Sequence, residues 1–142
     1  MWRRASKYGL SLCFIVLGLG CRRIAYQPLE GGRYVIDAHG APPALHGATL
    51  DLNLHLDRAT LANGTSAVTL ALTRVGDRDA WTPHCGTMSS SAMLEPARLS
   101  PRRFVLGGNA WTFDTVHADC GGGGLRMITD DGSGDRWTFT RQ

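Results

Sequence analysis

The alternation of leucine with polar residues in TLDLNLHLD, residues 49–57, constrains the fold of this chain more than any other feature. Successive side chains of a β-strand point to opposite faces, whereas a helix repeats about every 3.6 residues. The period of two therefore predicts a strand with a buried leucine face and a solvent-exposed polar face. Residues 67–74 show the same alternation.

Asn63-Gly64 lies between these two segments and is a strong hairpin signal. We expect the leucines of both segments to share one face of the sheet: Leu54, Leu56, Leu70 and Leu72. This requires that the numbers of facing residues have an even sum. A two-residue loop at Asn63-Gly64 gives an odd sum. We therefore expect a three-residue loop with Gly64 in the left-handed region, or a bulge near Arg58.

Five more segments have the composition typical of strands: residues 33–38, 103–106, 110–116, 125–129 and 136–141. The residues 107–109, GGN, predict a hairpin between two of them. In the last two segments the apolar residues share parity and are expected to face one another: Leu125, Met127, Trp137 and Phe139. Residues 81–99 are the least regular, with a short helix at 91–99 as one interpretation. About seven short strands indicate an all-β fold, a small antiparallel barrel or sandwich.

The first twenty residues have the order of a secretory signal peptide. Arg3, Arg4 and Lys7 give a cationic start, and residues 10–20 are an unbroken apolar run. That run is little more than half of the roughly 20 apolar residues that a membrane-spanning helix needs. We therefore expect residues 1–20 to be removed.

Residues 17–21, LGLGC, resemble the lipobox of bacterial lipoproteins, with Gly18 where that family prefers leucine. Cysteine parity favours the same interpretation. Cys13 is removed with the signal peptide, so three cysteines remain, and an odd number leaves one thiol unpaired in an exported protein. If Cys21 is acylated, the remaining two cysteines can pair. The resemblance implies a diacylglyceryl anchor on Cys21. Because Arg22 replaces the aspartate that favours inner-membrane retention, it also implies the periplasmic side of the outer membrane. Plain secretion after ordinary signal peptidase cleavage is the alternative.

In this interpretation residues 21–32 are the lipidated cysteine and a tether, and residues 33–142 form a single β-domain. Cleavage removes three of the fifteen basic residues, which leaves twelve arginines against twelve acidic residues. A nearly neutral domain argues against nucleic acid as a partner, since such binders need a basic patch. Arg22-Arg23, beside the anchor, are suited to anionic headgroups or are ordinary solvated arginines.

Two further resemblances concern the domain itself. Residues 32–35, GRYV, resemble the opening Gly-x-Trp strand of lipocalins, with tyrosine in place of tryptophan. The strand after a Gly-Pro loop, the segment 115–120 and the closing RWTF at 136–139 are similar to META-domain lipoproteins. The Cys-Asn pair of that family after its second strand is absent. Both resemblances imply a small β-domain, and neither adds a site residue.

Cys85 and Cys120 are expected to form a disulfide, because an exported domain matures in an oxidising compartment. The alternative is a metal site. Two thiolates and two imidazoles are a possible zinc set, made of His84, Cys85, His117 and Cys120. Met88 and Met93 nearby would suit Cu(I).

The known catalytic and cofactor motifs do not fit this chain. The serines at 89–91 lie in no Gly-x-Ser-x-Gly elbow, and the glycines at 121–124 have no following lysine. The calcium-like spacing at 131–135 lacks the glycine and glutamate of such a loop. We therefore expect no enzyme and no cofactor. The expected function is a lipid-anchored β-domain that binds a protein, peptide or envelope component, with a metal-binding lipoprotein that uses the four residues above as the alternative.

Overall fold

The computed structural model describes residues 23–87, 90–120, 123–128 and 136–142. The predicted signal peptide, Cys21 and Ser89 lie outside these residues, as does the calcium-like spacing at 131–135. Within the described ranges, no helix has the length and apolar character needed to cross a membrane. The helices are single 3-10 turns at Pro43–Leu45 and Arg78–Ala80.

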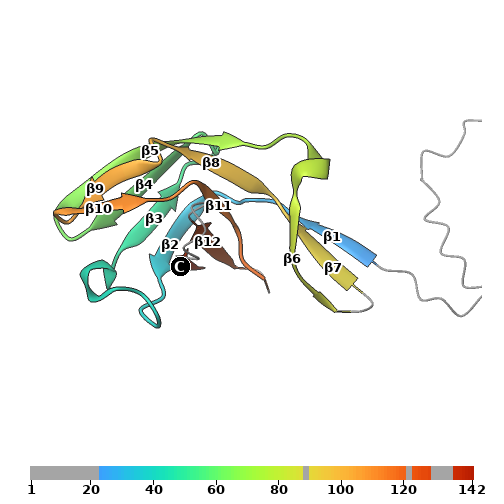
Figure 1. Ribbon diagram of the computed structural model, residues 1–142, viewed down its shortest axis with the longest axis horizontal. Coiled ribbons are helices and arrows are strands. Elements are labelled where there is room, and N and C mark those ends of the chain that lie inside the picture. The colour runs from blue at the N-terminus through green and yellow to red at the C-terminus, as the bar shows by residue number, and fades with distance from the viewer. Residues whose placement is uncertain (1–22, 88–89, 121–122, 129–135) are drawn as a thin grey trace, which may run out of the picture.

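Eight strands form a closed antiparallel barrel in the order β2-β3-β4-β5-β8-β11-β12-β13, and β13 pairs back to β2 (Figure 1). Their bounds are Gly32–Ile36, Thr49–Leu52, Arg58–Asn63, Ser66–Arg74, Pro96–Ser100, Thr115–Ala118, Gly124–Ile128 and Arg136–Arg141. Spatial order follows chain order, so this is an up-and-down barrel. The all-β prediction is confirmed, and of its two forms the barrel is the one observed.

The alternation of buried and exposed residues explains the closure. In β2 Tyr34 and Ile36 are buried, whereas Arg33 is exposed and Val35, between the two buried residues, is half-buried. The same pattern recurs in β13, where Trp137 and Phe139 face inward. An eight-stranded barrel is just wide enough for side chains to fill. Here leucine and aromatic side chains from the barrel strands form one continuous core.

Two hairpins are inserted into this meander. β6 (Thr82–Thr87) and β7 (Ser90–Leu94) lie between β5 and β8, and β9 (Arg103–Leu106) and β10 (Asn109–Thr112) lie between β8 and β11. β7 also pairs in parallel with β1 (Arg23–Gln27), which makes a three-stranded sheet in the order β1-β7-β6. We call this sheet the flap. Figure 1 shows the flap and the β9–β10 hairpin at opposite ends of the molecule.

The predicted strand at 49–57 is correct only as far as Leu52. The side chain of Asn53 folds the chain back, because its Oδ1 accepts hydrogen bonds of 3.0 Å from the N–H groups of both Asp57 and Arg58. Leu54 is 91% exposed, and Leu56 reaches the core from a backbone with φ 55°. The leucine–polar alternation in the sequence therefore runs through a turn, and the pattern gives no sign that the strand has ended.

The hairpin at Asn63-Gly64 exists, but its predicted register is wrong. β4 and β5 pair Asn63 with Ser66 and Ala59 with Leu70, so facing numbers have an odd sum. The loop has two residues, Gly64 with φ 60° and Thr65. The predicted register assumes that the segment with Leu54 and Leu56 faces β5. The strand that faces β5 is β4, and its inward residues, Ala59 and Leu61, have odd numbers.

Other expectations are divided. The parity of the last two strands is confirmed, since Leu125 faces Phe139 and Met127 faces Trp137. The β9–β10 hairpin also forms, around two glycines with positive φ. Part of the predicted tether is wrong, because Arg23–Gln27 is strand β1. The helix considered at 91–99 is wrong too, since β7 and β8 occupy that segment.

Candidate functional site

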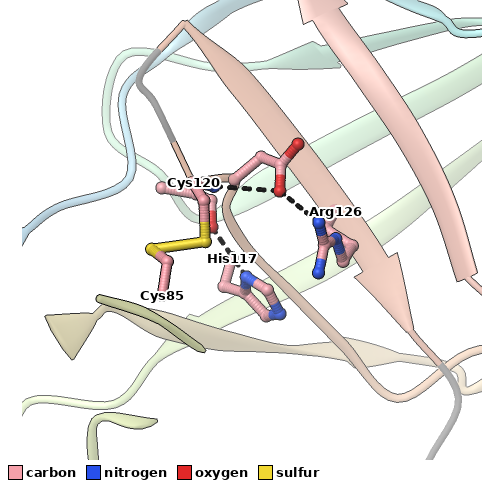
Figure 2. A network of polar contacts seen from close by, with 6 residues as sticks. Cys85, His117, Cys120 and Arg126 are labelled. Carbon is pink, nitrogen blue, oxygen red and sulfur yellow. Dashed lines mark hydrogen bonds and ion pairs between the residues drawn. A yellow bond between two sulfur atoms is a disulfide. The ribbon is translucent and has the colours of Figure 1, made fainter. Parts of the chain in front are cut away.

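The flap is joined covalently to the barrel. Cys85 in β6 and Cys120, just after β11, form a disulfide with their Cα atoms 5.8 Å apart (Figure 2). This lies within the roughly 4.4–6.8 Å expected for such a bond. The predicted pairing is confirmed.

A β-bulge turns Cys85 toward the barrel. The pairing of β6 with β7 shifts between Pro83, which faces Met93, and Cys85, which faces Ala92. In a regular strand, residues 83 and 85 share a face, whereas one extra residue moves the second of them to the other face. The bulge therefore places Cys85 on the face that carries the buried Leu94. Without the bulge, Cys85 would point away from the barrel and could not bond to Cys120.

Below the disulfide, polar side chains lie on the outer wall of the barrel. His117 and Arg126 face each other across β11 and β12, on the side opposite the inward Val116 and Met127. Asp119 Oδ1 accepts hydrogen bonds from Cys120 N–H at 2.9 Å and from Arg126 Nη2 at 2.5 Å (Figure 2). This ion pair orders the turn that presents Cys120.

The structure does not form the alternative metal set. Both sulfurs are consumed by the disulfide, so neither Cys85 nor Cys120 supplies a thiolate. His117 is 2% exposed, and its Nδ1 lies 2.7 Å from the carbonyl of Ala118, which can only accept, so Nδ1 carries a proton. The side chains of His84 and Met88 lie outside the described part. Among the described residues, no three potential ligands cluster.

Glu95 fastens the base of the flap. Its side chain is 2% exposed and accepts 2.8 Å and 2.7 Å hydrogen bonds from Leu29 N–H and Arg74 Nε. Its own N–H donates to the carbonyl of Gln27 at 3.0 Å. One carboxylate thus connects the end of β1, the end of β5 and the passage from β7 to β8.

The second candidate region is a cleft at the other end, where β2 ends and β13 begins. Two adjoining cavities of about 420 Å³ each share Gly40, Arg136 and Trp137. We call them together the loop cleft. The remaining lining residues are Asp37, His39, Ala41, Pro42, Ala110, Trp111, Thr112, Phe113, Arg126 and Thr138. Pockets of this size suit small ligands or short segments of larger ones.

Aromatic side chains make the cleft wall rigid. The Trp111 and Trp137 rings meet edge to face with centroids 4.9 Å apart, and Phe113 lies 4.1 Å from Trp137. Trp111 Nε1 donates to the carbonyl of Leu106 at 3.3 Å, which fixes the ring. Trp137 and Phe113 are almost fully buried, whereas Trp111 is half-buried, so the aromatic surface that the cleft offers is that of Trp111, held in place by the two rings behind it.

The polar groups of the cleft are suited to recognition. Asp37 Oδ1 accepts a 2.9 Å hydrogen bond from His39 N–H, so the one carboxylate in the described lining stabilises its own loop. Arg126 is paired with Asp119, and Arg136 is exposed at the start of β13. The titratable groups of the described lining are the Asp37 carboxylate, the His39 imidazole and the two arginines.

The opposite end of the barrel is closed by Tyr34. Its hydroxyl donates a 2.8 Å hydrogen bond to the carbonyl of Glu30, and Arg141 lies over its ring at 5.9 Å. Burial raises the pKa of Tyr34 above its ordinary 10.0, against a smaller opposing effect of the Arg141 charge. This end carries a smaller cavity of about 140 Å³.

Sequence reasoning found the disulfide but not the loop cleft. The residues of the cleft come from four segments: the end of the first predicted strand with the loop after it, the strand predicted at 110–116, and the last two predicted strands. Only barrel closure brings them together, and the Gly-Pro-rich loop at 39–47 was the one signal available. Searches among protein families, curated proteins and solved structures find no match to this chain.

Proposed function

We propose that this chain is a non-catalytic binding domain, anchored by acyl chains on Cys21 to the periplasmic face of the bacterial outer membrane. The observation that supports binding is the loop cleft, a preformed hollow with an aromatic wall and a polar rim. The sequence features that support the anchor are the apolar run ending at Cys21 and the cysteine parity. With Cys85 and Cys120 bonded to each other, Cys21 is the one remaining cysteine after the predicted signal peptide.

The ligand class follows from the lining. A half-exposed tryptophan, an exposed arginine and two threonines suit a peptide or another polar envelope component. Figure 1 shows the cleft loop, residues 37–48, on the side of the barrel away from the flap.

Photocrosslinking in intact cells tests the cleft. A photoreactive residue at Ala110, exposed at the cleft, should capture a discrete envelope partner. The matched control is Thr69, exposed on the outer wall of β5, which should not capture it. Trp111→Ala should weaken the capture at Ala110. Equal capture at both positions, or no loss with Trp111→Ala, would contradict the assignment to the cleft.

The anchor has a separate test. Cys21→Ala should abolish incorporation of labelled fatty acid and leave the precursor uncut or the protein soluble. Cys13→Ala, in the apolar run, is the matched control and should be acylated normally. If Cys21→Ala still fractionates with membranes and carries label, the anchor is refuted.

A further inference from the structure

The outward side of the flap is an apolar face that the barrel does not cover. Ile24 is 53% exposed and Tyr26 is 46% exposed, and they share a face because they are two residues apart in β1. Cross-strand pairing adds the neighbours on that face: Ser91, Met93, Pro83 and Gly86. We call these six residues the docking face. None of them is charged.

The other side of the flap turns toward the barrel. It carries Cys85, bonded to Cys120, and Leu94, which is 1% exposed. The bulge between Pro83 and Cys85 divides the two sides, with Pro83 outward and Cys85 inward. The disulfide and the bulge therefore fix which side of the flap points away from the molecule.

The docking face has a cationic and aromatic rim. The Arg78 guanidinium lies over the Tyr26 ring, 4.6 Å from its centroid, and Trp81 meets the same ring edge-on at 5.6 Å. Arg23 is exposed at the start of β1, although its side chain lies on the other face of the strand from Ile24 and Tyr26. Trp81 is buried beneath Tyr26 and Arg78, whereas these two are of the residue types that favour the interface between hydrocarbon and water.

The short separation between β1 and Cys21 favours a lipid layer as the surface that the docking face contacts. Arg23 follows Cys21 by two residues, and an extended chain spans at most about 3.6 Å per residue, so their Cα atoms lie within about 7 Å. The headgroup layer of one leaflet is roughly 5–8 Å thick. A lipid on Cys21 thus holds β1 at that layer, with no length of chain to carry it elsewhere.

The backbone of β1 also tolerates this environment. β1 is an edge strand of the flap, with β7 as its one pairing neighbour in the described chain. Gln27 accepts from Glu95 N–H on the β7 side, so by alternation the polar groups of Ile24 and Tyr26 point to the free edge. The hydrated headgroup layer can satisfy these groups, whereas the hydrocarbon core cannot.

We propose that the docking face lies in the phospholipid headgroup layer of the membrane that holds the acyl chains of Cys21. This proposal rests on the proposed anchor. It converts a flexible attachment into a fixed orientation, with the flap on the membrane and the β9–β10 end directed into the periplasm. The exposed arginines favour a leaflet that contains anionic lipid.

The test uses the full-length acylated protein in vesicles of phosphatidylethanolamine and phosphatidylglycerol. An environment-sensitive fluorescent residue is placed at Ile24, and its quenching by spin-labelled lipid headgroups is measured. Val105, 63% exposed on the far hairpin, is the matched control position. We expect several-fold stronger quenching at position 24 than at 105. Equal quenching at the two positions in acylated protein overturns the docking.

Two further measurements separate the possible causes of failure. A photoreactive residue at position 24 in cells should give a phospholipid adduct, whereas a protein adduct there would show that a partner strand occupies the edge and overturns the proposal. Tyr26→Asp should keep fatty-acid label and the disulfide but lose cleft-outward orientation, seen as increased quenching at 105. A protein without fatty-acid label overturns anchor and docking together, while a labelled but unquenched protein overturns docking alone.

Discussion

Removal of the disulfide should lower the free energy of unfolding by several kcal/mol. The loss should be the same whether one cysteine or both are replaced. Cys85 and Cys120 are 35 residues apart, and closing a loop of that length in the unfolded chain contributes about 3.8 kcal/mol. For a domain of about 110 residues this corresponds to a fall in melting temperature of roughly 15 °C. Cys85→Ser and Cys120→Ser should each lose this amount, and the double variant should lose little more, because one constraint is removed in every case.

The assay is urea unfolding of the detergent-solubilised protein, followed by tryptophan fluorescence. Reducing agent is the internal control, since it should destabilise the wild type by the same amount and leave both serine variants unchanged. Flap release need not open the barrel, whose core is formed by other residues. Additive losses in the double variant, or a wild type indifferent to reduction, would refute the shared constraint and point to two separately buried thiols.

Other predictions concern the core, the flap base and the barrel end. Leu61→Ala, in the barrel core, should cost roughly 2–5 kcal/mol in urea unfolding, whereas Leu54→Ala, at a 91% exposed position, should change stability by less than about 0.5 kcal/mol. Glu95→Ala should cost roughly 1–3 kcal/mol because it leaves the buried Leu29 N–H without an acceptor, and Glu95→Gln, which keeps an acceptor, should cost less. The raised pKa of Tyr34 means that the folded state keeps a proton that the unfolded state releases above 10.0. Stability should therefore fall as pH rises above that value, and Tyr34→Phe should show a smaller fall.

The sequence predicts fold class because strand alternation depends on local burial. Segments whose inward residues are all large and apolar, such as β5 and β13, were found with their faces correct. The alternation at 49–57 misled because a turn closed by one side chain, Asn53, leaves the pattern of leucines unchanged. Composition alone cannot distinguish a strand that continues from one that reverses.

The flap was missed for a different reason. β1, β6 and β7 face solvent over much of their surface, so they lack the alternation that marks a half-buried strand. Pro83 and Pro96 suggested irregular structure, yet one lies in an edge strand and the other is the first residue of a strand, where a missing N–H is tolerated. The disulfide could be predicted from the number of cysteines and the expected oxidising compartment. The bulge that orients Cys85 toward Cys120 could not be predicted from either.

The seam of the barrel has a consequence for biogenesis. Hairpins between consecutive strands form as soon as the second strand is available, but β2 must wait for β13, and the paired Ile36 and Phe139 are 103 positions apart. A chain that crosses a membrane with its N-terminus first therefore exposes the free edge of β2 until its last strand has arrived. Until then the half-made barrel is an open sheet whose unpaired edge can pair with other chains.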